Sequence, residues 1–70
     1  MANIELIKKR ISDAIKTSGL TQTKLAEMLA VSPSCVAHYV KGDIMPSIPT
    51  FVDLCLLLDV DPADLLGLKD

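Results

Sequence analysis

Seventy residues provide for one small domain and exclude a second hydrophobic core. Half of them are hydrophobic and only Tyr39 and Phe51 are aromatic, which favours packed helices over a sheet, where aromatic and β-branched residues concentrate. The net charge of −2 argues against a polyanionic partner, but residues 1–41 carry +3 and residues 42–70 carry −5. Such a division suggests that one half meets nucleic acid, with two ordinary solvated faces as the alternative.

The first predicted helix covers residues 3–18. Its apolar side chains recur with the helical period: Ile4, Ile7, Ile11, Ala14 and Ile15. Asn3 can cap the start of this helix, and Gly19 fits the left-handed position that commonly follows a helix.

Thr21 is expected to cap a second, short helix. The residues of this second helix that are expected to face inward are Leu25, Ala26, Met28 and Leu29. Ser32 followed by Pro33 predicts the start of a third helix over residues 33–41, because serine is a favoured cap and proline lacks the amide that would be unpaired there. Gly42 ends it. Two short helices joined by so few residues have the helix-turn-helix spacing.

Residues 43–46 are expected to form a loop, and Ser47 to open a fourth helix. Its inward stripe is Phe51, Leu54, Cys55 and Leu58. Asp61 and Pro62 repeat the cap-plus-proline start for one last turn. The sequence therefore predicts an all-α, compact five-helix domain over residues 1–70, without strands. We expect this core: Ile7, Ile11, Ile15, Leu25, Ala26, Leu29, Val31, Val36, Val40, Phe51, Leu54 and Leu58.

No catalytic or metal site is expected in this pattern. Cys35 and Cys55 are too few for a disulfide framework and are expected in the core, where free cysteine acts as a small apolar group. Cys35 and His38 lie three residues apart, but two ligands do not make a structural metal site. His38 has no adjacent carboxylate in the helical pattern, so we expect neither an enzyme nor a cofactor.

The sequence predicts neither a membrane span nor a signal peptide. No apolar run approaches the roughly 18 residues of a membrane span. The first ten residues lack the apolar segment of a signal peptide, so we expect a cytoplasmic protein with no membrane partner.

The segment that carries most information is LTQTKLAEMLAVSPSCVAHYVKG at residues 20–42. Together with Pro46 and DVDPADLL at residues 59–66, it resembles the lambda-repressor-like helix-turn-helix family of phage repressors, Cro proteins and bacterial regulators. The resemblance covers residues 4–66 and implies a transcriptional regulator that contacts the major groove with its third helix, with repression favoured over activation. A protein-interaction module, such as an antitoxin-like partner, is the alternative.

The resemblance implies seven residues that contact double-stranded DNA: Gln22, Lys24, Pro33, Ser34, Ala37, His38 and Lys41. Gln22 corresponds to a glutamine that holds a phosphate, while Lys24 and Lys41 suit the DNA backbone. Ser34 can hydrogen-bond a base edge, and Ala37 and the Pro33 ring can meet a thymine methyl group. His38 can donate a ring N–H to a base acceptor, or contact a phosphate when protonated.

The chain departs from the family pattern at several positions. Ile15 and Val40 replace an arginine and a glutamate that commonly form a buried ion pair, and matched apolar groups can substitute for such a pair without loss of stability. Ala30 stands where a glycine is common, so a positive φ there is expected to cost about 1 kcal/mol. Lys24 replaces the acidic residue of the capping box.

The apolar residues of the last two helices outnumber the places in so small a core. They are Val52, Leu56, Leu57, Leu65, Leu66 and Leu68. An exposed apolar cluster often marks an interface, so we expect a homodimer formed through the fifth helix and the end of the fourth. The alternative is that these leucines only cover the core.

Overall fold

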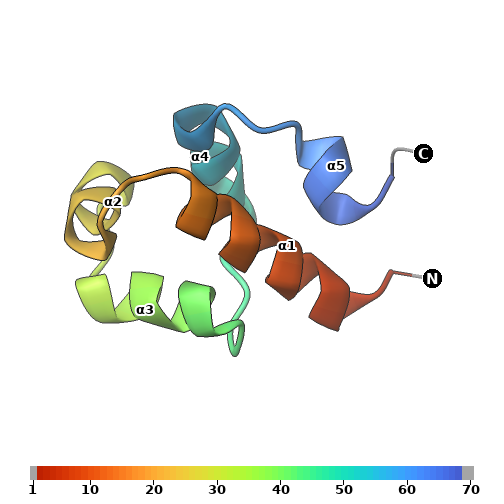
Figure 1. Cartoon of the computed structure of the whole chain (residues 1–70), viewed down its shortest axis with the longest axis horizontal. Coiled ribbons are helices and arrows are strands. Elements are labelled where there is room, and N and C mark those ends of the chain that lie inside the picture. Colours follow the sequence, from red (N-terminus) through yellow and green to blue (C-terminus); the bar gives the residue numbers. More distant parts are fainter. Residues whose placement is uncertain (1, 69–70) are drawn as a thin grey trace.

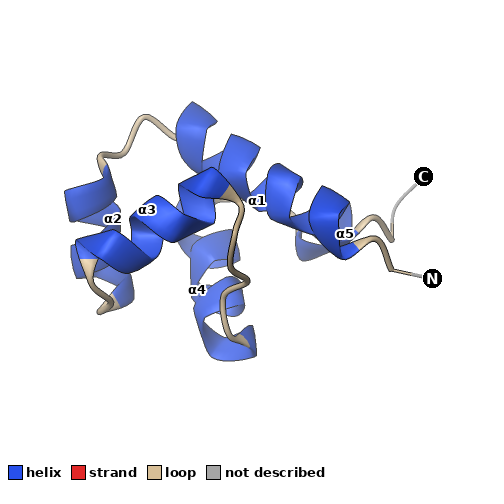
Figure 2. Cartoon of the chain, turned by 90° about the horizontal axis from the view of Figure 1, so that it is seen from below, coloured by secondary structure: helices blue, strands red, loops and turns tan. Residues whose placement is uncertain are grey.

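The computed structural model describes residues 2–68, and every regular element in that range is a helix (Figures 1 and 2). In chain order they are α1 (Ile4–Thr17), α2 (Gln22–Leu29), α3 (Pro33–Lys41), α4 (Ile48–Leu58) and α5 (Pro62–Leu66). The predicted all-α, five-helix fold is confirmed. None of these helices is long and apolar enough to cross a lipid bilayer.

Each helix begins at a side chain that caps it. The capping residues are Asn3, Thr21, Ser32, Ser47 and Asp61. The Ser32 hydroxyl, for example, accepts from the Cys35 amide at 3.1 Å. Such a cap stabilises a helix by about 1 kcal/mol because it pairs an amide that has no acceptor within the helix. The capping positions predicted from the sequence are therefore confirmed.

The longest helix, α1, lies between α3 and α5 (Figure 1). It packs against both of them, while α2 packs against α3 and α4. The α2–α3 pair lies toward one end of the molecule, and both ends of the described chain lie toward the other, beside α5 (Figure 1). The α2–α3 pair is thus supported on one side by α1 and α4, and its opposite surface is not covered by another helix within residues 2–68.

The core forms where the inner faces of all five helices meet. Its buried members are Ile7, Ile11, Ile15, Leu25, Ala26, Leu29, Val36, Tyr39, Leu54, Cys55 and Leu65. Eight of the twelve expected core residues are among them, and the other four, Val31, Val40, Phe51 and Leu58, pack half-buried against the cluster.

Three apolar residues lie elsewhere than the helical pattern predicted. Ile4 and Met28, which are expected on inward stripes, are exposed. Ile4 is the first residue of α1, and Met28 lies at the edge of the buried stripe that Leu25, Ala26 and Leu29 form on α2. Leu65 was assigned to an exposed cluster but is buried, because α5 packs on α1. Cys35 is half-buried, whereas Cys55 is in the core as expected.

A neutral contact joins α1 to α3 where the family commonly has an ion pair. Ile15 is buried and Val40 is half-buried against the core. Ser12, the only buried polar residue among those described, donates its hydroxyl to the Val40 carbonyl at 2.6 Å. This hydrogen bond fixes the end of α3 on α1 without burying a charge.

The turn between α2 and α3 depends on a left-handed alanine. Ala30 has φ 57° and ψ 42°. This conformation lets its amide donate to Glu27 and lets the Val31 amide donate to the Ala26 carbonyl at 3.0 Å. The Cβ of an L-residue crowds the backbone in this conformation, which costs about 1 kcal/mol. Ala30 thus has the positive φ under which the cost of about 1 kcal/mol applies.

We expect Ala30→Gly to raise the free energy of unfolding by up to about 1 kcal/mol, because glycine has no Cβ to crowd the backbone. Denaturant unfolding measures this change. Ala2→Gly is the control, since Ala2 is exposed and lies outside the helices. A loss of stability in Ala30→Gly would contradict the strain at this position.

Candidate DNA interface

The first turn of α2 presents two of the expected DNA contacts. Gln22 is the first residue of α2, and both Gln22 and Lys24 are exposed. Thr21 fixes this turn because its side-chain oxygen accepts from the Lys24 amide at 3.0 Å. The start of a helix also carries partial positive charge and unpaired amides, which suit a phosphate.

The opposite faces of α3 have different roles. Its inner face consists of Val36 and Tyr39, both buried, with Val40 half-buried beside them. The other five expected contact residues share the outer face: Pro33, Ser34 and Lys41 are exposed, and Ala37 and His38 are half-buried. The helical spacing of these five residues brings them onto one surface. Their contact with DNA stays a prediction.

The expectation that His38 lacks a neighbouring carboxylate is wrong. Its Nδ1 atom lies 3.0 Å from Oδ1 and 3.1 Å from Oδ2 of Asp43. Both side chains stay about half exposed, at 45% and 47%. The hydrogen bond with His38 lowers the pKa of Asp43, and the charge of Lys41 acts in the same direction.

The end of α3 explains this contact. Gly42 has φ 79°, and its amide donates to the carbonyls of His38 and Tyr39. The Asp43 amide also turns back, to the His38 carbonyl at 3.3 Å. The left-handed glycine thus folds Asp43 over the last turn of α3. Helical periodicity does not predict a contact at this spacing, although a glycine followed by an aspartate was a usable signal.

Four lysines surround a cavity of about 280 Å³ between α1 and the end of α3. They are Lys8, Lys9, Lys16 and Lys41. Lys8 lies 3.5 Å from Glu5 and Lys9 lies 3.0 Å from Asp13, so two of the four charges are paired. Lys16 and Lys41 have no ion pair within residues 2–68. Two positive charges of the first half, both unpaired within that range, therefore lie at the C-terminal end of α3.

Cys35 and His38 each contact a different partner. The Cys35 thiol and the Tyr39 hydroxyl share a hydrogen bond, and burial together with this contact raises the pKa of Tyr39 to about 12. His38 faces Asp43 instead. Within the described range, no three His, Cys, Asp or Glu side chains are grouped to hold a metal ion.

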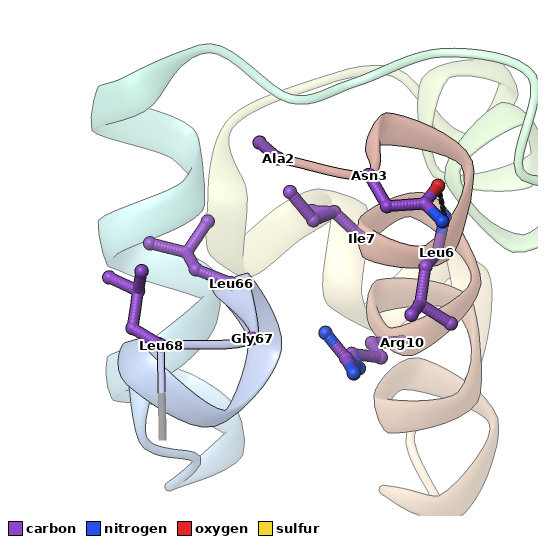
Figure 3. A pocket seen from close by; sticks show the side chains of 8 residues that line it. All are labelled: Ala2, Asn3, Leu6, Ile7, Arg10, Leu66, Gly67 and Leu68. Atoms are coloured by element: carbon purple, nitrogen blue, oxygen red, sulfur yellow. Dashed lines mark hydrogen bonds between the residues drawn. The ribbon is translucent and has the colours of Figure 1, made fainter. Parts of the chain in front are cut away.

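A second cavity, of about 490 Å³, lies between α1 and the end of α5. Figure 3 shows Arg10 of α1 between the two helices, with Leu66 and Leu68 on the α5 side. The Arg10 guanidinium approaches Gly67 so closely that a Cβ there would lie 2.5 Å from Nη1. This cavity faces the α5 end of α1 rather than the outer face of α3.

Comparison with protein families identifies a helix-turn-helix domain. A family model described as helix-turn-helix, of the Cro/C1 type, matches residues 11–65, which include the whole of α2, α3 and α4. Neither the curated proteins nor the solved structures yield a significant match. The matched range covers most of the chain and includes the seven residues expected to contact DNA. The chain therefore belongs to the lambda-repressor-like helix-turn-helix family of DNA-binding domains.

Proposed function

We propose that this protein is a cytoplasmic transcriptional repressor that binds a specific duplex site as a homodimer and inserts the outer face of α3 into the major groove. The observation that carries the proposal is the division of α3. Its inner face is fixed by Val36 and Tyr39, while its outer face leaves Ser34 and Lys41 exposed. A rigid helix with small outward side chains suits close approach to base edges.

Charge supports the same orientation. Lys24 is exposed in the first turn of α2, and Lys16 and Lys41 line the cavity beside α3. The exposed aspartates Asp53, Asp59, Asp61 and Asp64 all lie on α4, α5 or the loop between them. Phosphates attract the first surface and are repelled by the second, so the α4–α5 side is expected to face away from DNA.

The dimer is proposed through α5 and the end of α4. Of the six apolar residues assigned to that surface, Leu65 is buried and Leu66 packs against the core. Val52, Leu56, Leu57 and Leu68 remain exposed, and Leu56 and Leu68 are 75% and 76% exposed. These four residues, three on α4 and one just after α5, define the candidate dimer surface. A two-fold pair doubles the DNA contacts and favours half-sites about one helical turn apart.

Selection from a random duplex pool at two salt concentrations tests the function. We expect Ser34→Ala and His38→Ala to change the preferred bases, by roughly tenfold for each hydrogen bond to a base that the substitution removes. Lys24→Gln and Lys41→Gln should instead weaken binding to all sequences alike. Each should lower the slope of log affinity against log salt by about 0.9 for every phosphate that the lysine neutralises.

Arg10→Gln is the charge-matched control for the lysine variants. It also removes one positive charge, but Arg10 lines the cavity between α1 and α5. Its salt slope should equal that of the unsubstituted protein. If all four substitutions at Ser34, His38, Lys24 and Lys41 left affinity and base preference unchanged, α3 would not be the DNA-contacting helix.

One observation favours a second candidate function, a protein-interaction module. Ile48, Val52 and Leu56 recur every four residues along α4, and all three are exposed. Such an apolar stripe suits a helix or sheet of a partner protein. The salt experiment separates the two functions, because only nucleic acid releases condensed counterions on binding. The absence of salt-dependent retention on duplex would favour the interaction module.

A further inference from the structure

The ring of His38 is held by Asp43 at one nitrogen only. Both carboxylate oxygens face Nδ1, at 3.0 Å and 3.1 Å. Asp43 is itself positioned by the backbone, since its amide donates to the His38 carbonyl and Gly42 takes the left-handed conformation that allows the turn. Ring and carboxylate therefore form one unit at the exposed end of α3.

The chemistry of the pair determines where the ring proton lies. The pKa of Asp43 is lowered, chiefly by its hydrogen bond with His38, so the carboxylate is ionised near neutral pH. An ionised carboxylate only accepts hydrogen bonds, so Nδ1 must carry the proton that it donates. A neutral imidazole has a single N–H. The second nitrogen, Nε2, is then left with a lone pair.

We propose that Asp43 fixes the Nδ1–H tautomer of His38 and so makes Nε2 a hydrogen-bond acceptor toward DNA, selecting a base that offers an amino group in the major groove. This inference rests on the proposed DNA-binding function of α3. Adenine N6 and cytosine N4 are the amino donors in that groove. Guanine and thymine offer such a ring only acceptor atoms. These acceptors would face the Nε2 lone pair with no hydrogen between them. The expectation that His38 donates to a base acceptor is thereby reversed for the neutral ring.

The tautomer can be measured without DNA. The chain has one histidine, so a long-range nitrogen–proton correlation spectrum of the labelled full chain, in alkaline buffer, reports His38 alone. We expect a protonated Nδ1 and a bare Nε2. Asp43→Ala should shift the ring toward the Nε2–H form. Asp53→Ala, which removes an exposed carboxylate on α4, should leave the spectrum unchanged. A protonated Nε2 in the unsubstituted protein would overturn the proposal.

Base selection is the second measurement, with two variants that carry the same change of charge. Asp43→Ala and Asp43→Asn both remove one negative charge, but the asparagine carbonyl can still accept from Nδ1. We expect the unsubstituted protein and Asp43→Asn to favour adenine or cytosine over guanine or thymine at one position of each half-site, by roughly tenfold. Asp43→Ala should lose this preference, and His38→Ala should lose it too.

The outcomes separate this inference from the proposed function. If no duplex is enriched by any variant, the DNA-binding function fails. If duplexes are enriched but Asp43→Ala keeps the preference of the unsubstituted protein, the function stands and the role of Asp43 is refuted. Enrichment with an unchanged preference in His38→Ala would likewise exclude His38 from base contact.

Discussion

Replacing Leu54 by alanine is expected to lower the free energy of unfolding by about 2–5 kcal/mol. Leu54 is 1% exposed and lies in the cluster where α4 meets the other helices. Truncation removes apolar packing and leaves a cavity that a well-packed core fills only in part. In a domain of this size, such a change is a large share of the total stability.

The control for this variant lies two residues along the same helix. Leu56 is 75% exposed, so Leu56→Ala should change stability by no more than about 0.5 kcal/mol. Denaturant unfolding measures both, at protein concentrations where sedimentation finds a monomer. Leu54→Met, which nearly conserves volume, should lose less than about 1.5 kcal/mol and remains measurable if the alanine variant does not fold. Equal losses at Leu54 and Leu56 would contradict the packing of α4.

Leu56→Lys is expected to reduce affinity for a duplex with two half-sites by about 100-fold or more, because it places a charge on the candidate dimer surface and removes the gain from joint binding. Affinity for a duplex with one half-site should change little. Leu56 suits this test better than Leu66, since Leu66 packs against the core and its substitution would also destabilise the fold. At a protein concentration well below the dissociation constant for one half-site, sedimentation should find two chains per two-site duplex for the parent and mostly free duplex for the variant.

Ile48→Lys is the matched control for the dimer prediction. Ile48 is 80% exposed at the start of α4, so it gains the same charge outside the candidate dimer surface. An added lysine can raise affinity for any duplex, and the ratio of two-site to one-site affinity removes this effect. If Leu56→Lys kept the parent's ratio, the dimer would not use this surface.

The sequence predicts the fold well because its strongest signals are local. Ser32 with Pro33, and Asp61 with Pro62, determine the start of α3 and of α5 through single capping residues. The family pattern, in which glycine is common at the position of Ala30, marks this residue as one where a positive φ would carry strain. Helical period then assigns most of the core, since a helix packed on one side buries one stripe.

The features that the sequence does not predict have a common physical cause. They depend on how the helices pack and on the turns between them, which helical periodicity does not encode. The burial of Leu65 depends on where α5 rests on α1, and a single helical turn carries too little pattern to predict it. The contact between His38 and Asp43 depends on the left-handed turn at Gly42, which lies outside helical spacing. The outer face of α3 follows from its buried face, but its DNA partners do not, because exposed side chains carry no packing constraint.

The uncharged contact between Ser12 and Val40 has a consequence for how this domain responds to ionic strength. It supports the junction of α1 and α3 where a buried ion pair is common in the family. The ion pairs of Lys8, Lys9 and His38 each include a partner that is about half exposed or more. Screening by salt acts on exposed charges and leaves a buried neutral hydrogen bond unaffected. Added electrolyte should therefore release the duplex long before it loosens the helices, so that occupancy of a DNA site can follow the ionic environment while the free protein remains folded and ready to bind again.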